Sequence, residues 1–323
     1  MIKKRQGIKN LSLFITIVLF VALFLLGAVA FDNFFSLSTF FNLLNDNAYL
    51  IIVSTGVTFV LLAGGIDISV ASTVAFTCVL SAFLLRAGVP AGIVILLVLL
   101  IGAAFGAGMG SLIQFFKLQP FIVTLAGQFF FRGMCAVIST ESIPISDAFY
   151  MDMALNKLVF GRAKLYYYVL IALVVVLASW YTLKHTRFGR NVYAVGGSEQ
   201  SALLMGLPVA RTKVLVYTIS SFCASLGGMV FSFYTLAGYS LQNIGLELDA
   251  ISSAVIGGTL LTGGVGTPIG SLFGVLIQGV IQNLVTYQNL NTWWTKVANA
   301  ALLCIFIVIQ RIIALRAEKE RLG

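Results

Sequence analysis

Long apolar segments fill nearly all of this chain, and short polar stretches separate them. A helix needs about 20 apolar residues to cross the hydrocarbon core of a bilayer, and runs such as LSLFITIVLFVALFLLGAVA meet that length. Strands of a transmembrane barrel would instead give short segments of alternating hydrophobicity. The pattern therefore predicts an all-α polytopic bundle of about ten spans, near residues 11–30, 46–63, 68–87, 89–115, 120–140, 165–184, 214–238, 248–263, 267–288 and 294–312.

The number of spans is open at two places. Only a tight turn around Gly88 and Pro90 separates the third span from the fourth, and only a glycine cluster at 263–266 separates the eighth from the ninth. A count of about eight or nine spans therefore stays open.

Basic residues predict the orientation of the bundle. Lysines and arginines cluster before the first span, after the last span and in the loop at 184–213. Positively charged segments stay on the cytoplasmic side, and an even number of spans places all of these stretches there. We therefore expect cytoplasmic N and C termini, a cytoplasmic loop at 185–213 and an external loop at 141–164.

Composition supports a membrane protein and argues against other classes. Hydrophobic residues make up 59% of the chain and charged residues 10%, whereas soluble domains are roughly 45–50% apolar. The net charge of +9 is interpreted as topological bias and contact with anionic membrane lipid, not as a nucleic-acid footprint. The length leaves no room for a soluble catalytic domain, so we expect residues 1–323 to form a single transmembrane domain.

The chain lacks the residues that a catalytic site or a metal site would need. His185 is the only histidine, and the four cysteines are widely separated within predicted spans and have no CxxC spacing. A histidine-based metal site needs more ligands than this, and no nucleophile–base pair is evident. We therefore expect no enzyme activity, no catalytic residues, no metal and no cofactor.

A glycine pair interrupts the apolar pattern in LAGGIDISVAS, residues 62–72. Membranes tolerate exposed backbone only where protein or a watery cavity satisfies it, so a broken helix here could border a transport route lined by Gly64, Gly65, Asp67, Ser69 and Ser72. In the other interpretation, the glycines form a turn between two spans and Asp67 caps the next helix at the interface. The sequence does not decide between these two interpretations.

A similar segment, LTGGVGTPIGS, occupies residues 261–271. It matches the first at the leucine, the glycine pair, the following aliphatic residue and the final serine. Glycine-interrupted segments in corresponding positions of two halves point to a central route between repeats, although a match this short can arise by chance.

The loop at 186–213 contains a predicted short helix from Glu199 to Met205. Ser198 can cap its N-terminus and Gly206 can end it. A helix outside the membrane with apolar residues, here Ala202, Leu203 and Met205, must bury them against something. Another protein subunit would serve, as would the bilayer surface or the bundle itself.

Polar residues also gather near the external ends of the spans. Glu247 and Asp249 precede the eighth span, with Gln242 and Asn243 just before them. Together they could meet a hydroxylated ligand or a docking protein, although acidic residues at a helix N-terminus are also ordinary dipole partners. Arg132 follows a largely apolar stretch, and we expect it to extend to the interface rather than line a polar route.

Three segments together resemble a known family. LAGGIDISVAS, TRFGRNVYAVGG with SALLMGLPVAR, and AVIGGTLLTGGVGTPIGSLFGVLI resemble, in order and spacing, the sugar-importing ATP-binding-cassette (ABC) permeases related to the ribose permease. The resemblance spans nearly the whole chain. Within that family, ESIPI, ELDAISSAVIGGTLLTGGVGT and NTWWTK are most similar to a permease subunit of a bacterial galactofuranose importer. Ala71 departs from the family pattern, because many relatives have glycine there.

The resemblance implies a permease of the bacterial inner membrane that takes a monosaccharide from periplasm to cytoplasm. Its partners would be a second, different permease subunit, ATP-binding-cassette subunits and a periplasmic sugar-binding protein. The chain has no GxxxxGK[ST] phosphate loop, so a partner would hydrolyse the ATP. The residues implied in coupling to that ATPase are Glu199, Ser201, Ala202, Leu203, Met205 and Gly206. The alternative is an ion-coupled sugar transporter that uses Asp67.

Overall fold

The computed structural model describes the backbone of residues 2–31, 34–291 and 293–322, and the side chains of those from 13 to 309. The helices are α1 (Ile2–Ala30), α2 (Leu37–Leu62), α3 (Val70–Arg86), α4 (Ala91–Phe115), α5 (Pro120–Ile138), α6 (Ala148–Leu155), α7 (Tyr167–His185), α8 (Arg187–Gly197), α9 (Glu199–Leu204), α10 (Val209–Thr235), α11 (Leu246–Ile256), α12 (Pro268–Tyr287) and α13 (Trp293–Leu322). Short strands pair as β1 (Ile143–Pro144) with β4 (Ala237–Gly238), and β2 (Lys157–Phe160) with β3 (Ala163–Tyr166).

The all-α polytopic class is confirmed. Within the described residues, 7 helices are long and apolar enough to cross a membrane, and α3 and the first part of α13 are shorter apolar helices. Helices form at nine of the ten predicted spans, but the helix expected over 248–263 is wrong in extent. α11 has 11 residues and is therefore about 16 Å long, well short of a hydrocarbon core of about 30 Å.

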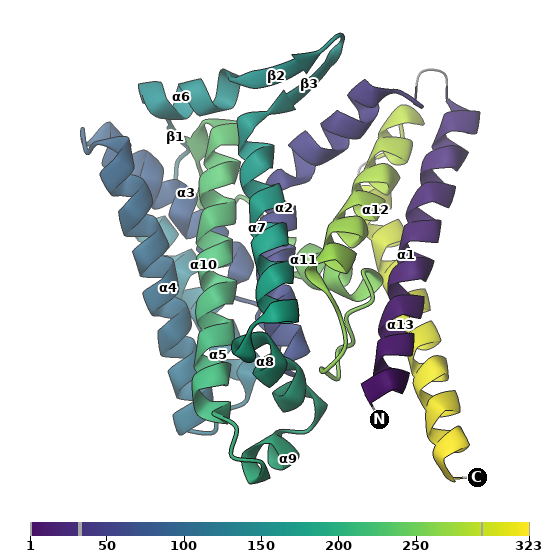
Figure 1. Ribbon diagram of the computed structural model, residues 1–323. Helices are drawn as coiled ribbons and strands as arrows, with labels where there is room; N and C mark the ends of the chain where they lie inside the picture. The colour runs from purple at the N-terminus through teal and green to yellow at the C-terminus, as the bar shows by residue number, and fades with distance from the viewer. Residues whose placement is uncertain (1, 32–33, 292, 323) are drawn as a thin grey trace.

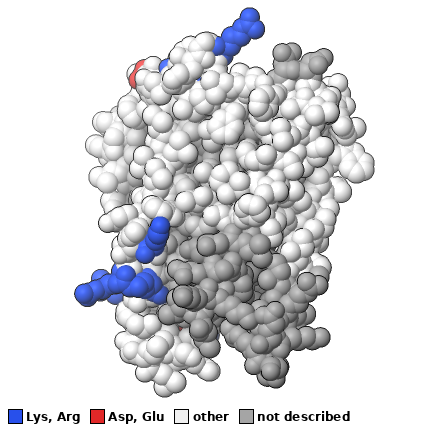
Figure 2. Space-filling view, turned by 45° about the vertical axis from the view of Figure 1, so that its right-hand side comes forward, with Lys and Arg blue, Asp and Glu red and all other residues white. Residues whose placement is uncertain are grey.

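The two ends of the bundle differ in structure (Figure 1). The chain ends lie at the same end of the molecule as α8 and α9, while α6 and the β2–β3 hairpin cover the other end. In the space-filling view, a broad band without charged side chains separates the Lys and Arg residues at the top from those lower down (Figure 2). An uncharged band of this kind is the surface that lipid tails require.

α2 begins nine residues before the predicted span, because Ser36 caps it. The Ser36 hydroxyl accepts a 3.1 Å hydrogen bond from the Thr39 backbone N–H, which satisfies one of the free donors of the first turn. The added turns carry the polar residues Asn42 and Asn45, which interrupt the apolar run by which a span is recognised in the sequence.

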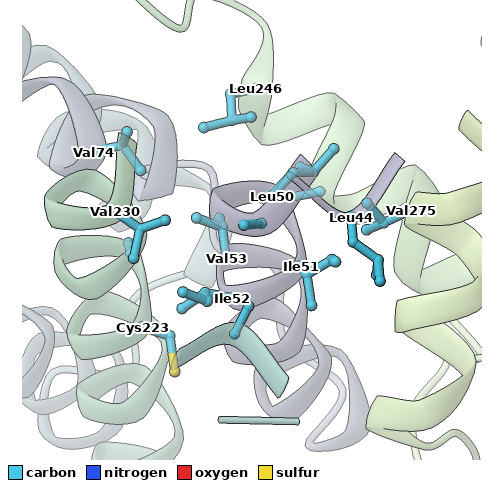
Figure 3. Packing of buried hydrophobic residues seen from close by; sticks show 14 of the residues in the cluster. Leu44, Leu50, Ile51, Ile52, Val53, Val74, Cys223, Val230, Leu246 and Val275 are labelled. Atoms are coloured by element: carbon cyan, nitrogen blue, oxygen red, sulfur yellow. The ribbon is translucent and has the colours of Figure 1, made fainter. Parts of the chain in front are cut away.

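The buried core surrounds α2, the most enclosed of the long helices. Figure 3 shows its apolar side chains among those of α3, α10, α11 and α12. Lipid tails are as apolar as these side chains, so close packing rather than escape from water holds the helices together. Ile52, which is fully buried, illustrates the scale: truncation to alanine leaves a cavity that costs about 2–5 kcal/mol.

Small residues let α4 and α10 approach closely. Gly102 and Gly106 of α4 face Ser225 and Ser221 of α10, and a Cβ atom at either glycine would overlap those side chains. The GAAFGAGMG segment at residues 102–110 therefore serves close helix packing.

Candidate functional site

The helix break predicted at Gly64 and Gly65 is present. α2 ends at Leu62, the chain turns through Gly64 with a left-handed φ of 79°, and α3 starts at Val70. Glycine adopts such a φ without the strain that a Cβ atom would cause. Seven residues of non-helical backbone, 63–69, thus separate the two helices, and where they are buried protein must satisfy their polar groups.

Asp67 is fully buried beside this break, and serines occupy both of its carboxylate oxygens. Oδ1 accepts hydrogen bonds from the Ser69 hydroxyl at 2.6 Å and the Ser69 backbone N–H at 3.0 Å. Oδ2 accepts one from the Ser220 hydroxyl of α10 at 2.7 Å. Asp67 therefore fastens the start of α3 to α10. It resembles a helix cap, and its carboxylate is enclosed by protein.

The residues predicted to line a sugar path differ in their exposure. Ser69 and Ser72 are fully buried, and the Ser72 hydroxyl donates to the Ser69 carbonyl. Gly64 and Gly65 border a pocket of about 60 Å³, shared with Glu199. That volume can hold a few waters but no sugar ring, so this pocket, as the described residues form it, is too small for a sugar.

Sequence reasoning missed Ser220. It lies 153 positions from Asp67 in an apolar helix, and nothing in its local sequence marks it. The only available signal was indirect, because a carboxylate in a predicted membrane segment requires a partner from another helix.

The two similar glycine segments meet in space. The Gly264 backbone N–H donates a 2.9 Å hydrogen bond to the Leu62 carbonyl, and a Cβ atom on Gly263 would stand 2.9 Å from the Gly64 nitrogen and 2.9 Å from the Gly196 oxygen. Gly64 and the glycine pairs 196–197 and 263–264 thus form one contact, which we call the glycine junction. Only glycine allows three backbones to approach this closely.

α8 supplies the glycine pair 196–197 and a further link to the second loop. The Tyr193 hydroxyl donates a 2.9 Å hydrogen bond to the Gly266 carbonyl. The sequence did not predict α8, whose apolar face packs Val192 and Val195 inward. Because α9 follows α8 after one residue, any displacement of α9 reaches the glycine junction through a single short helix.

The helix predicted at Glu199–Met205 is confirmed, one residue shorter. The Ser198 hydroxyl accepts a 3.2 Å hydrogen bond from the Ser201 N–H, and Gly206 ends the helix with a φ of 72°. Glu199 forms a 2.6 Å ion pair with Lys213 at the start of α10.

The apolar residues of α9 divide into an inner and an outer set. Ala202 is buried against Val195 and Val209, so it fixes α9 to the bundle and cannot itself touch a partner. Leu203, Leu204 and Met205 are 65%, 89% and 66% exposed. Leu204 is the most exposed of these, and the run of three large apolar residues was a signal for it that our sequence prediction did not use.

A second candidate site lies among α2, α11, α12 and α13. It is a pocket of about 350 Å³, which we call the outer pocket. Its lining residues are Asn47, Tyr49, Leu50, Asn243, Ile244, Leu246, Asp249, Gln278, Gln282, Trp293, Thr295, Lys296 and Asn299. Asp249 and Lys296 form a 2.6 Å ion pair that joins α11 to α13.

The polar group predicted before the eighth span separates in the structure. Asn243 and Asp249 line the outer pocket, while the Glu247 carboxylate accepts a hydrogen bond from the Gln128 amide of α5. Arg132, which we expect to extend to the interface, is partly buried. Its guanidinium donates to the Gln242 carbonyl at 2.9 Å and the Ser240 carbonyl at 2.6 Å, so it anchors the loop before α11.

Comparison with known proteins identifies the family. Residues 39–308 match the family described as branched-chain amino acid transport system / permease component. The inner membrane ABC transporter permease protein YjfF of Escherichia coli K12 is 47% identical over 306 residues, which cover 94% of this chain and 92% of that protein. No solved structure matches.

Further relatives carry names of sugar importers. The fructose import permease protein FruG of Bifidobacterium longum is 38% identical, with 98% of this chain and 94% of that protein covered. The ribose import permease protein RbsC of Haemophilus influenzae is 33% identical, with 90% and 91% covered. The chain therefore belongs to this permease family: it is a permease subunit of an ABC importer and not an enzyme, and a partner subunit hydrolyses the ATP.

Proposed function

We propose that the protein is the inner-membrane permease subunit of an importer that moves a monosaccharide from periplasm to cytoplasm. The names of its relatives give fructose, ribose, and galactose or methyl galactoside, which are monosaccharides or the methyl glycoside of one. Galactofuranose, or a related furanose or pentose, is our specific assignment, and it is supported by the resemblance at 141–145, 247–267 and 291–296.

The observation that carries this proposal is the exposed apolar surface of α9, a helix that α8 connects to the helix break at the glycine junction. Leu203, Leu204 and Met205 form an apolar tip in the loop that connects α7 to α10. Solvent contact of three large apolar side chains is unfavourable, and an ATP-binding-cassette subunit in the cytoplasm is the partner that would cover them. Glu199, Ser201 and Gly206 hold the tip in shape, through an ion pair, a cap and a turn.

The proposed mechanism is alternating access driven by the partner. ATP binding closes the partner subunits and moves α9, and α8 carries that movement to the glycine junction. There the loops that follow α2 and α11 shift together, because the Leu62–Gly264 hydrogen bond joins them. Residues Gly64, Gly65, Asp67, Ser69 and Ser72 border the route that opens, and ATP hydrolysis resets it.

A second permease subunit would complete the route. Ile244, which lines the outer pocket, and Leu248 of α11 are each 66% exposed. Lipid can cover apolar side chains but not the ion pair and amides between them, so another protein must face this surface. We propose that the occupant is a second, different permease subunit, with a periplasmic sugar-binding protein docking on the α6 end.

The test is uptake by the assembled transporter in proteoliposomes. Labelled galactofuranose, ribose and fructose are supplied through the binding protein, with and without vanadate and with and without an uncoupler. Uptake that vanadate blocks and the uncoupler spares supports the proposal and identifies the sugar. Uptake that resists vanadate and collapses with the ion gradient would refute it.

A further inference from the structure

We propose that the outer pocket is a monosaccharide-binding site within the permease itself, occupied during transport. This inference rests on the proposed function and extends it by naming where this chain holds the sugar. The pocket volume of about 350 Å³ is within the range of small-molecule sites. It is the larger of the two spaces discussed above, and the pocket at the helix break is too small for a sugar ring.

The lining matches the chemistry of a sugar. A pyranose or furanose has an apolar C–H face and a rim of hydroxyl groups that both donate and accept hydrogen bonds. Trp293 supplies a large aromatic surface for the apolar face. Asn243, Gln282 and Asn299 supply amides, and Thr295 supplies a hydroxyl, and these groups can donate and accept in turn.

Several of these polar groups have no partner in the part of the chain that the structure describes. The unpaired atoms are the Asn243 amide nitrogen, the Thr295 hydroxyl and the Asn299 amide oxygen, all of them buried. A buried polar atom without a partner is unfavourable, and the hydroxyl groups of a sugar could supply the missing partners. The three come from two separate segments, the loop before α11 and helix α13, and converge on one pocket.

Gln278 also lines this pocket, but its side-chain amide is hydrogen-bonded within the protein, in contrast to the three unpaired groups. Its amide nitrogen donates to the Ser252 hydroxyl at 2.6 Å, and its oxygen accepts from the Ser253 hydroxyl at 3.1 Å. With a further 3.3 Å hydrogen bond from the same nitrogen to the Asp249 carbonyl, these bonds tie α12 to α11 and use both hydrogens of the Gln278 amide. The unpaired state of Asn243, Thr295 and Asn299 is therefore a property of those positions, not of the whole pocket.

The pocket is also held in shape from outside. Arg132 of α5 binds the carbonyls of Ser240 and Gln242, next to Asn243, and the Asp249–Lys296 ion pair joins the two helices on either side. A site that is already formed loses little entropy on binding. Weak binding by so few unpaired groups suits a transit site, because the sugar must leave again.

The experiment compares single substitutions in the fully assembled transporter. Thr295→Val removes one hydroxyl at nearly constant shape, and Trp293→Leu removes the aromatic surface. Thr218→Val is the matched control for the first, because Thr218 hydrogen-bonds within α10 and lies outside the outer pocket. Trp294→Leu is the control for the second, since Trp294 is 57% exposed but does not line the pocket.

Two readouts are needed: ATP-driven uptake of the three labelled sugars, and ATP hydrolysis stimulated by the loaded binding protein. We expect Thr295→Val to lower uptake about three- to tenfold and Trp293→Leu to lower it further, with hydrolysis and assembly retained. Both controls should match the unmodified transporter.

The outcomes separate the two proposals. If the unmodified transporter imports none of the sugars with ATP, the proposed function fails. If it imports sugar and Thr295→Val is indistinguishable from Thr218→Val, the outer pocket is not a transit site. Loss of the second permease subunit from the Trp293→Leu complex, with Thr295→Val fully active, would assign the pocket to subunit assembly and overturn the inference.

Discussion

The Ser220 hydroxyl donates a 2.7 Å hydrogen bond to Oδ2 of Asp67, across 153 positions of the chain. This contact joins α10 to the start of α3 at the point where α2 has ended. A buried carboxylate without its donor keeps the full cost of leaving water. The Asp67–Ser220 hydrogen bond is therefore expected to stabilise the helix break, whichever substrate is transported.

Ser220→Ala tests that role. It removes the only donor to Oδ2 among the described residues, and we expect the free energy of unfolding to fall by about 1–3 kcal/mol. Thermal unfolding of the detergent-solubilised protein measures the change. Ser232→Ala is the control, because the Ser232 hydroxyl donates to a carbonyl in its own helix. Equal stability of the two variants would contradict the role assigned to Ser220.

Asp67→Asn separates a structural carboxylate from an ion-coupling one. Asparagine can still accept from Ser69, and the Ser220 hydroxyl can turn to accept from the new amide. We expect ATP-driven uptake within about threefold of the unmodified transporter, with unchanged resistance to an uncoupler. Abolished uptake in a correctly folded variant would contradict a purely structural role and support the alternative in which the Asp67 carboxylate binds the coupling ion.

Gly196→Ala probes the glycine junction. A Cβ atom at this position would overlap the Leu62 carbonyl, so the loops after α2 and α11 must separate from α8. We expect uptake to be lost and stability to fall by about 1–3 kcal/mol, the range for overpacking. Gly108→Ala on α4 is the matched control, since nothing lies within 4 Å of its added Cβ. An active Gly196→Ala transporter would show that the junction need not stay closed.

The sequence predicts the long helices of this fold well, because hydrocarbon thickness sets their length and a run of apolar residues shows it directly. It predicts α11 poorly, since AVIGG looks like a continuing span although Gly257 and Gly258 end the helix. It predicts the helix break and the short helix α9 from glycine and serine positions alone. It gives no indication of Ser220 or of the α13 residues in the outer pocket, because both depend on which helices become neighbours.

Leu204→Asp tests the coupling surface. Leu204 is 89% exposed at the tip of α9, so a charge there leaves this fold intact but cannot be buried against an apolar partner without a large desolvation cost. We expect normal membrane insertion, loss of co-purification with the ATP-binding-cassette subunit and no uptake. Val159→Asp, on the hairpin at the opposite end and 59% exposed, should keep the ATPase bound. If Leu204→Asp retains the ATPase and full uptake, the tip of α9 is not the contact, and the partner must engage another part of the loop between α7 and α10.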